Sequence, residues 1–411
     1  TICVMRNVKG KGIKSPAELV GLKPFKDDKL LRHEAIERMK RRMQRNLKEA
    51  GFMDEHQKQM EPIVEWVKTS GDLLPTAEPT GEDVTDAIRQ KAIDLGYGEV
   101  GFTKSDRHYV YQSRKVDMKS GLPNAICLAL EQDYVKTQTI PSMEAEDTHF
   151  GTYFNQGPLT MELVAFIHSL GYQCQVSGPT WHYGPMIPMF VDAGLGQLGA
   201  NGQLLSPHFG SRARLQIIFT DAKLTHDQPV DYGIHSFCQE CKVCVDRCPG
   251  RALMPEKVWY RGVEKNKLAF KRCRPVMARY EGCGICMKVC PIQRYGMKPV
   301  MEHYVQTGQV LGKGTDNLEG YTLSDKGYFG SGEMPHFDNE FFDMPHGRSE
   351  DWLLIEFREK LMGAKGDDVD RAVTAAFLDF AKAFNRIDHR LLLFKLLHGA
   401  GIGGRLFRWV A

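Results

Sequence analysis

The chain has 411 residues, of which 42% are hydrophobic and 26% charged, a composition typical of a globular protein with two or three domains. It carries 54 Lys and Arg residues against 51 Asp and Glu residues, which gives a formal net charge of +3. This near balance gives no electrostatic reason to expect nucleic acid or an acidic membrane as the main partner. No apolar run approaches the roughly 18 residues that a membrane helix needs, so we expect no membrane span.

The first 80 residues are polar and charge-rich, and we interpret them as a packing arm, domain 1–80. An amphipathic helix is predicted over 30–50, with a basic stretch at 38–48 that we expect to be solvated rather than bound to phosphate. The Pro/Gly/Thr-rich stretch 74–81 is predicted to be a linker. No positively charged segment runs into an apolar stretch, so we expect no secretory signal, and polar residues after Arg42 disfavour a twin-arginine signal.

From residue 81 onward the pattern alternates between helix and strand. The predicted elements, in chain order, are a helix over 84–95, a strand over 98–102, a strand over 124–130, a helix over 159–170 and a strand over 215–220. Such alternation predicts an α/β layered domain over residues 81–230.

The most specific motif is a run of four cysteines that ends in proline. Cys238, Cys241, Cys244 and Cys248 precede Pro249, which is the CxxCxxCxxxCP spacing of a bacterial-type ferredoxin cluster. A tight loop of this kind turns several thiolates toward one iron-sulfur cluster. The sequence therefore predicts a ferredoxin-like domain that begins at about residue 231.

A second, less regular group follows within the predicted domain 231–300. Cys273 stands ten positions before Cys283, and Cys283, Cys286 and Cys290 with Pro291 repeat the CxxC and CxxxCP spacings. Zinc sites with four cysteines also use CxxC, but they do not need the CxxxCP ends. We therefore expect two [4Fe-4S] clusters.

The last cysteine of each run is expected to reach across to the other cluster. The first cluster should be held by Cys238, Cys241, Cys244 and Cys290. The second should be held by Cys248, Cys273, Cys283 and Cys286. Two adjacent clusters of this kind form an electron relay. Because eight of the 11 cysteines fall in this region rather than in a disulfide framework, we expect a reducing, cytoplasmic compartment.

One glycine-rich segment precedes the cysteines. Gly194, Gly196 and Gly199 match GxGxxG, but Asn201 and the residues after it leave little room for the long helix of a dinucleotide fold. The glycines would let backbone approach a flat or phosphate-bearing ligand, which makes these four residues candidate cofactor contacts. A plain loop is the alternative.

The order of the motifs resembles the reductive dehalogenase family, which is also similar to the epoxyqueuosine reductases. The resemblance covers about residues 85–300. It rests on Tyr153, then FIHSLGYQC (166–174), DAGLGQLGANGQLLSPHFGSRARL (192–215), FTDAKL (219–224) and the two cysteine motifs. It implies a nitroreductase-like α/β domain that binds base-off cobalamin beside two [4Fe-4S] clusters. Neither Asp106-Arg107-His108 nor Asp147-Thr148-His149 continues as the DxHxxG that would supply a histidine to cobalt.

The same resemblance implies three catalytic residues. Tyr153 stands at the position of the family's proton donor, and Arg212 at that of the arginine that supports it. A fixed positive charge lowers the pKa of a tyrosine and makes it a better proton donor. The family's third polar residue would fall near Pro179, which cannot play that role, so His182 is the substitute that we expect, beside aromatic pocket walls.

The C-terminal stretch divides in two. Residues 301–362 are aromatic-rich and are expected to wrap back over the α/β domain. The tail at 363–411 contains AAFLDFAKAFNRIDHRLLLFKLL, which resembles the first metal-aspartate motif of non-LTR reverse transcriptases, with Asp379 at the carboxylate position. No second aspartate pair follows, so we expect a foreign junction without polymerase activity.

The sequence thus predicts a cobalamin-dependent enzyme that removes halogen from an organic substrate, with an aromatic one as a candidate. An external donor such as a ferredoxin or flavodoxin would supply its electrons, and neither nucleic acid nor a membrane would be a partner. Two alternatives stay open: an epoxyqueuosine reductase-like enzyme that acts on tRNA, and a non-catalytic iron-sulfur electron carrier.

Overall fold

The computed structural model describes three stretches of the chain, residues 52–178, 181–260 and 263–337. The chain divides into two compact units, and the described residues lie in one of them except for the hairpin tip 258–265. The helix predicted over 30–50 and the tail at 363–411 lie outside the described residues.

A four-stranded antiparallel sheet forms the centre of the first domain, which we call the sheet domain (residues 52–225). The strand order is β1-β2-β6-β3. The strands are β1 (Glu99–Lys104), β2 (Asn124–Glu131), β3 (Cys174–Ser177) and β6 (Ala213–Thr220).

The inner strand β2 is apolar because both of its faces are covered. Ile126 and Leu128 pack into the core on one face of the sheet, and Ala125, Cys127 and Ala129 pack into the core on the other. Alternate residues of a strand point to opposite faces, so a strand buried on both sides has a continuous apolar run rather than an alternating one. This explains why 124–130 gave a strong strand signal.

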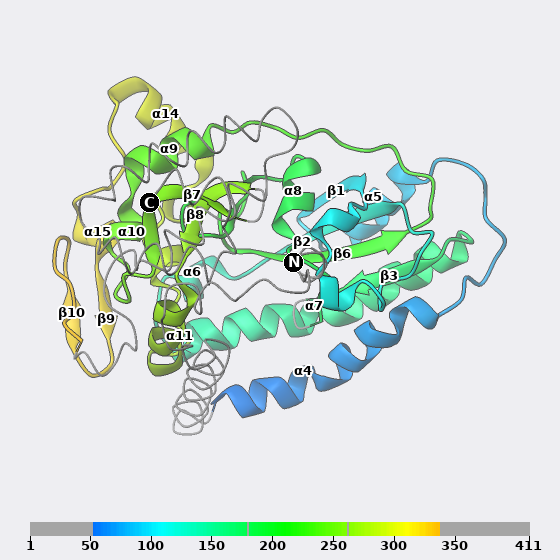
Figure 1. Cartoon of the computed structure of the whole chain (residues 1–411), viewed down its shortest axis with the longest axis horizontal. Coiled ribbons are helices and arrows are strands. Elements are labelled where there is room, and N and C mark those ends of the chain that lie inside the picture. Colours follow the sequence, from blue (N-terminus) through cyan, green and yellow to red (C-terminus); the bar gives the residue numbers. More distant parts are fainter. Residues whose placement is uncertain (1–51, 179–180, 261–262, 338–411) are drawn as a thin grey trace, which may run out of the picture. The chain divides into compact units, whose positions relative to one another are not determined.

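Helices cover both faces of this sheet (Figure 1). Helices α4 (Phe52–Thr69), α5 (Thr85–Asp94) and α7 (Met143–Ser169) contribute to the core that contains Ile126. Helix α8 (Ile187–Asp192) contributes to the core that contains Cys127. Short elements connect them: η2 (Ser70–Asp72), η3 (Arg107–Tyr109), η4 (Gln112–Arg114), α6 (Tyr134–Thr137), β4 (Gln197–Leu198) and β5 (Leu204–Leu205).

The layering of helices and strands predicted from the sequence is confirmed in the sheet domain. The predicted linker 74–81 contains neither helix nor strand. The sheet differs from the parallel sheet that helix-strand alternation often produces, because all of its neighbouring strands run antiparallel.

Helix α7 is 27 residues long and begins well before the predicted helix over 159–170. Its start is capped by Ser142, whose side chain accepts a hydrogen bond from the Ala145 backbone N–H. The apolar stripe that predicted the helix lies in its second half. The first half carries polar and aromatic side chains such as His149 and Tyr153, so it has no apolar periodicity to detect.

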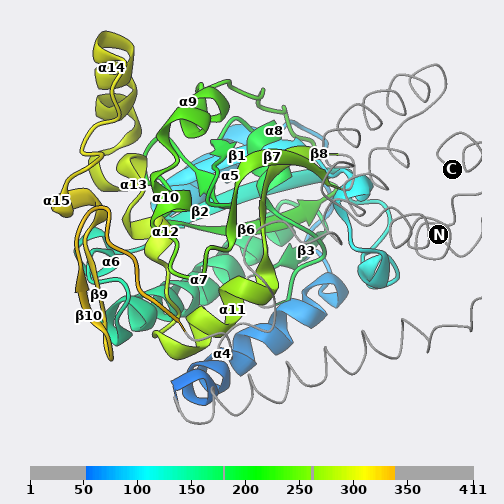
Figure 2. The same ribbon diagram turned by 60° about the vertical axis from the view of Figure 1, so that its left-hand side comes forward.

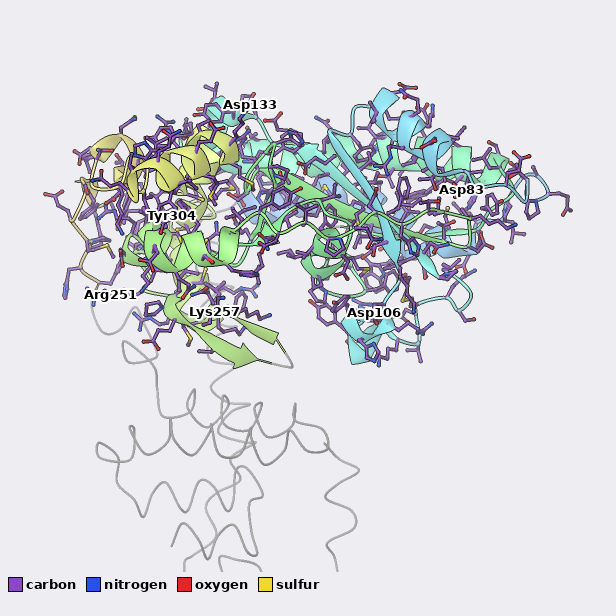
Figure 3. All side chains as sticks on the ribbon, turned by 90° about the horizontal axis from the view of Figure 1, so that it is seen from above. Asp83, Asp106, Asp133, Arg251, Lys257 and Tyr304 are labelled. Carbon is purple, nitrogen blue, oxygen red and sulfur yellow. The ribbon has the colours of Figure 1, made fainter. Side chains whose placement is uncertain are left out.

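The second domain, which we call the cysteine domain (residues 231–257 and 266–337), is built from short helices. They are α9 (Ile234–Cys241), α10 (Val243–Asp246), α11 (Phe270–Arg279), α12 (Ile285–Lys288), α13 (Pro291–Tyr295), α14 (Met297–Thr307) and α15 (Asp316–Glu319). Strands β7 (Leu253–Tyr260) and β8 (Val263–Leu268) pair with each other, as do β9 (Tyr321–Leu323) and β10 (Gly327–Phe329). Figure 3 shows Tyr304 of this domain away from Asp83 and Asp106 of the sheet domain.

Segment 301–362 is described only as far as residue 337, and its wrapping over the α/β domain stays a prediction. Leu318, Tyr321, Leu323 and Phe337 belong to the buried core of the cysteine domain rather than covering the sheet. Figure 2 shows α14, α15, β9 and β10 grouped beside α13. The aromatic residues thus complete a small core that short helices alone could not close.

The two domains share buried contacts. Ile140, Ala145, Ala200 and Leu205 of the sheet domain pack into the core of the cysteine domain. None of the helices in the described ranges combines the length and apolarity needed to cross a bilayer.

Candidate functional site

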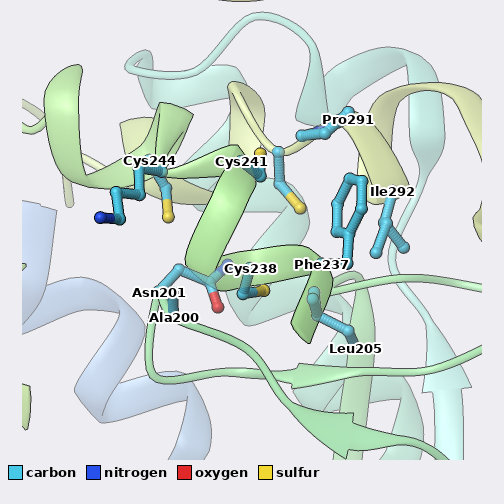
Figure 4. Close-up of a pocket in the computed structure, with 11 residues that line it drawn as sticks. Ala200, Asn201, Leu205, Phe237, Cys238, Cys241, Cys244, Pro291 and Ile292 are labelled. Atoms are coloured by element: carbon cyan, nitrogen blue, oxygen red, sulfur yellow. The ribbon is translucent and has the colours of Figure 1, made fainter. Parts of the chain in front are cut away.

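The site contains a cavity whose walls come from both the sheet domain and the cysteine domain (Figure 4). Its walls include Cys238, Cys241, Cys244 and Cys290. Phe237, Ile292 and Leu205 form its apolar sides. These four cysteines are the set predicted to hold one cluster.

Local backbone geometry turns these thiols toward one space. Lys242, between α9 and α10, has a left-handed conformation with φ of 53°, which lets the chain turn sharply between Cys241 and Cys244. Cys290 comes from the second motif and immediately precedes α13, where Pro291 starts the helix. The chain therefore brings cysteines of both motifs to the same cavity.

The other four cysteines interact with one another. The Cys286 thiol has its pKa raised first by burial and then by Cys248, Cys283 and Cys273. Cys248 is the last cysteine of the first motif, so each group of four contains one member from the other run. The structure brings together the two sets that the spacing predicted, and the Cys286–Cys290 and Cys244–Cys286 interactions connect them.

The loop before Cys286 turns sharply. Glu281, Gly282, Cys283 and Gly284 all have positive φ values, from 38° to 76°. Such a run of left-handed residues reverses the chain within a few residues and is rare outside ligand-binding loops. Burial raises the pKa of the Cys283 thiol, and so do the nearby Cys248 and Cys273 thiols.

The chemistry of the donor sets fits metal clusters. Burial raises the pKa of the Cys241 and Cys273 thiols to about 12, so thiolates there need a compensating positive charge such as iron. Backbone N–H groups support the thiolate form; that of Ala252 donates to Cys248 Sγ at 3.3 Å, and that of Ala200 donates to Cys238. In the described ranges, no three His, Cys, Asp or Glu side chains are grouped to hold a single metal ion.

The glycine-rich segment lies beside the cavity lined by Cys238, Cys241, Cys244 and Cys290. Ala200 and Asn201 line it, and the Asn201 Nδ2 donates to the Cys286 backbone oxygen at 3.5 Å. Gly196 has φ of 144°, and a Cβ there would lie 2.5 Å from the Leu205 oxygen. The glycine is therefore explained by close packing of β4 against β5.

Gly194 and Gly199 are explained in the same way. A Cβ on Gly194 would lie 2.5 Å from the Gln228 oxygen, and one on Gly199 would lie 2.8 Å from Asn201 Oδ1 and from a methyl group of Leu205. The segment is thus a tight hairpin rather than the start of a dinucleotide-binding helix. Whether these glycines contact a cofactor stays a prediction.

Tyr153 lies in the first half of α7, with its ring partly buried against the sheet-domain core. The guanidinium carbon of Arg214 is 5.9 Å from the centre of its ring, and the ring of His149 is 5.1 Å from it, centre to centre. Arg214 also approaches Met287 of α12, with Nη2 3.8 Å from the sulfur. Tyr153 therefore lies where α7, β6 and the cysteine domain meet.

Arg212 lies elsewhere, which corrects the expectation that it would lie beside Tyr153. Its Nη2 donates to Glu131 Oε1 at 2.6 Å and its Nη1 donates to the Gln293 oxygen at 3.1 Å. Its guanidinium also covers the ring of Tyr134, at 4.9 Å. No contact in the described part of the chain joins Arg212 to Tyr153. Arg212 instead ties the sheet to α13.

Spacing alone could not have chosen Arg214 over Arg212, although the structure shows why Arg214 faces Tyr153. The stretch that singled out Arg212 contains both arginines, two positions apart. On β6, Gln216 and Ile218 point toward the α7 side of the sheet, where they meet Thr160 and the Ile126 core. Because strand residues alternate with a period of two, Arg214 points to that side as well.

His182, the third catalytic candidate, is not brought to this place. Its ring contacts that of Tyr111 at 5.8 Å, and within the described ranges nothing joins it to Tyr153. Its neighbour Trp181 lies under Arg114, 3.5 Å from the guanidinium carbon. A role for His182 in catalysis stays a prediction.

Gln156, one turn after Tyr153, is a polar residue that sequence reasoning missed. Its Nε2 donates to the Arg214 oxygen at 3.2 Å, while its Oε1 is buried and has no hydrogen-bond partner in the described residues. Arg214 Nε is also buried, and it too has no hydrogen-bond partner in the described residues. Buried polar atoms without partners are costly, and they mark a place where a polar ligand would bind.

The chain was compared with known proteins. It is 34% identical over 181 residues to the tetrachloroethene reductive dehalogenase of Dehalobacter restrictus, a match that covers 41% of this chain and 32% of that protein. It is also 34% identical over 109 residues to the epoxyqueuosine reductase of Lactococcus garvieae, covering 25% of this chain and 30% of that protein. No family model matches the chain.

A solved structure gives the same similarity. The catabolic reductive dehalogenase in complex with 3-bromo-4-hydroxybenzoic acid superposes with a TM-score of 0.53 at 22% identity, covering 60% of this chain and 39% of that one. The resemblance to reductive dehalogenases predicted from the order of the motifs is confirmed. The chain spans about a third of the length of the curated relatives that it matches.

Proposed function

We propose that this chain, which resembles the reductive dehalogenases in sequence and fold, removes a halogen from an organic substrate with electrons that arrive through two [4Fe-4S] clusters. The observation that carries the proposal is the arrangement of eight cysteines in two mixed groups of four, beside a tyrosine covered by an arginine. The reaction takes two electrons and one proton, breaks the carbon-halogen bond, forms a carbon-hydrogen bond and releases halide.

The two clusters would form the electron path. Cys238, Cys241, Cys244 and Cys290 would hold one, and Cys248, Cys273, Cys283 and Cys286 the other. The interactions of Cys286 with Cys290 and of Cys244 with Cys286 support a short distance between them. Arg214 contacts both Tyr153 and Met287, next to Cys286, which supports a position of the second group near Tyr153.

A base-off cobalamin is the redox partner that we propose beside these clusters. When bound, it would supply the cobalt that takes the electrons to the carbon-halogen bond. Buried, unpaired Gln156 Oε1 and Arg214 Nε support a polar ligand at this place. The hairpin with Gly194, Gly196, Gly199 and Asn201 is the other candidate contact.

Tyr153 would supply the proton. The guanidinium carbon of Arg214 lies 5.9 Å from the centre of its ring and would be the positive charge beside it. The partly buried setting keeps water from competing for the proton. Arg214 thus takes the role predicted for Arg212, while Arg212 holds the sheet to α13.

Substrate and partners follow from the same proposal. The substrate would be an organohalide. Tyr183 is 1% exposed in a core of the sheet domain, so it is not a candidate wall for its pocket. An external donor such as a ferredoxin or flavodoxin would supply electrons in the cytoplasm, with no nucleic acid involved. The nitroreductase-like and ferredoxin-like descriptions of the two domains belong to this proposal as well.

The test is reconstitution of the anaerobically purified chain with iron, sulfide and cobalamin. A cobalamin absorption band beside the broad iron-sulfur absorption, and release of chloride or bromide from a panel of haloaromatics and haloalkenes, are expected. Iron-sulfur absorption alone, without halide release, would contradict the proposal and favour a non-catalytic electron carrier. Reduction of epoxyqueuosine in tRNA instead of halide release would identify the other enzyme.

A further inference from the structure

We propose that Arg247 places a buried positive charge beside the second cluster and thereby raises the reduction potential of that cluster. The second cluster is the one proposed for Cys248, Cys273, Cys283 and Cys286. The inference rests on the proposed function, since it takes these cysteines as cluster ligands. It adds a residue that controls electron transfer, and neither the motifs nor the resemblance gave Arg247 a role.

Arg247 is almost fully buried, with 2% of its surface exposed. It immediately precedes Cys248, and consecutive Cα atoms are about 3.8 Å apart. Cys248 packs against the core that contains Tyr321, and the guanidinium carbon of Arg247 lies 4.9 Å from the centre of the Tyr321 ring. Because an arginine cannot be deprotonated in a protein, this place holds a permanent positive charge away from water.

Backbone carbonyl groups of one segment bind the guanidinium. Its Nε donates to the Glu319 oxygen at 3.2 Å, its Nη2 donates to the Phe329 oxygen at 3.4 Å, and its Nη1 donates to the Glu333 oxygen. These carbonyl oxygens satisfy the donors without carrying a full negative charge. The hydrogen bonds therefore hold the cation in place and do not neutralise it.

Glu319 supplies the opposing charge. Within the described ranges it is the one carboxylate in ion-pair range of Arg247, with its Oε2 4.0 Å from Nε. Its Oε1 accepts from the Gly314 N–H and its Oε2 from the Ser331 hydroxyl, each at 2.7 Å. These bonds hold the carboxylate where it is, so loss of the Arg247 charge would leave it unopposed. The two residues therefore offer substitutions with opposite expected effects.

The two groups of cysteines differ in the residues that precede their members. Arg272 precedes Cys273 as Arg247 precedes Cys248; it is also 2% exposed, and its Nε donates to the Gly250 oxygen at 2.8 Å. The residues that precede the cysteines of the first group include no cation: they are Phe237, Glu240, Val243 and Val289. Buried arginines thus precede ligands of the second group only.

The sign of the effect follows from the charge of a cluster. Four thiolates make a [4Fe-4S] cluster negative, and reduction by one electron makes it more negative. A nearby positive charge stabilises the reduced form more than the oxidised form, most strongly where water is excluded. Other fixed charges, such as that of Glu146 at the Gly282 loop, alter the potential but not the direction of the Arg247 effect. Arg247 therefore favours electrons on the second cluster.

The test is an anaerobic redox titration of the full chain, reconstituted with iron and sulfide alone and followed by electron paramagnetic resonance. The signal that Cys273→Ala loses or alters belongs to the second cluster. In Arg247→Gln its midpoint potential is expected to fall by about 59 mV, a tenfold change in the reduction equilibrium for one electron. Arg247→Lys keeps the charge and should fall less, and Glu319→Gln should raise the midpoint.

The matched control is Arg89→Gln. Arg89 is a half-buried arginine of the sheet domain that also donates to a backbone oxygen, that of Val100 at 2.6 Å, and it pairs with Asp227. Its loss removes one positive charge from the same chain without touching the cysteine domain. Both midpoint potentials should stay unchanged in this variant.

An unchanged or higher midpoint in Arg247→Gln would overturn the inference. So would an equal fall in Arg247→Lys, or a fall in Glu319→Gln, because packing rather than charge would then explain the effect. If Arg247→Gln does not retain the second cluster, Glu319→Gln decides: a rise supports the inference and an unchanged midpoint overturns it. If the clusters form but no halide is released after cobalamin is added, the proposed function fails and the potentials still decide on Arg247. If no cluster forms in the intact chain, both fail.

Discussion

Arg214 on β6 lies over the ring of Tyr153 on α7, with its guanidinium carbon 5.9 Å from the ring centre. This pair connects β6 to α7. Arg214 also contacts Met287 of the cysteine domain, with its Nη2 3.8 Å from the sulfur. Under the proposed function, Tyr153 is the proton donor of this pair. The pair therefore defines where proton transfer would take place.

Arg214 and Arg212 should differ in what their loss affects. Arg214→Gln is expected to lower halide release by about tenfold to hundredfold, a larger effect on rate than its loss of the hydrogen bond from Nη2 to the Ser211 oxygen, at 2.6 Å, would cause through stability alone. Arg212→Gln should instead lower the free energy of unfolding by about 1–3 kcal/mol, since it leaves the Gln293 oxygen without its donor. Halide-release rates and thermal unfolding of both variants check this. Equal losses of rate with equal unfolding would contradict the distinction.

The exchange of cysteines between motifs can be measured directly. Cys290→Ala changes a residue of the second motif, but its thiol lines the cavity of Cys238, Cys241 and Cys244. We expect loss or alteration of the cluster held by the first motif, with about half of the iron retained. Cys248→Ala should affect the other cluster. Iron analysis and electron paramagnetic resonance of the reduced variants distinguish the two, and identical spectra would argue against the exchange.

Glu99 should make stability depend on pH. It is 5% exposed on β1, and burial raises its pKa to about 7 from an ordinary value near 4.5. Because the folded state binds the proton more tightly, Glu99 costs nothing below about pH 4.5 and costs stability increasingly as pH rises through 7. Glu99→Gln is expected to stabilise the chain at pH 8 by about 3 kcal/mol, with no gain at pH 4.5. Chemical unfolding at both pH values checks the sign.

The glycine hairpin offers a contrast between two positions with positive φ. Gly196→Ala would place a Cβ 2.5 Å from the Leu205 oxygen, whereas Gly202→Ala meets no atom within 4 Å. We expect the first to cost about 2–4 kcal/mol and to reduce cluster retention, because Ala200 and Asn201 line the first cavity. The second should cost about 1 kcal/mol from its φ alone. Similar losses in both would mean that packing does not explain Gly196.

Local patterns predicted much of the fold. The stripe of Val84, Ile88 and Ala92 predicted α5, which the structure has as Thr85–Asp94, and the buried run 124–130 predicted β2. The first half of α7 was not predicted, because its side chains serve the site rather than the core. The pairing of strands was not predicted either, since periodicity does not tell parallel from antiparallel neighbours.

For the site, spacing predicted which cysteines the structure would bring together, because short loops restrict where their thiols can point. It could not tell Arg212 from Arg214. That choice depends on where β6 begins and on which side chain the neighbouring α13 binds. Gln156 left no signal, since its importance lies in a contact with a residue far along the chain, the backbone oxygen of Arg214.

The measurement that tests the central claim most directly counts electrons against halide in the reconstituted chain. Reductant is titrated anaerobically into the chain with an organohalide that it accepts, and free halide is determined after each addition. We expect one halide ion for every two electrons, and none from Tyr153→Phe although its clusters and corrinoid are still reduced. Oxidised clusters without halide, or an equal halide yield from Tyr153→Phe, would contradict the account.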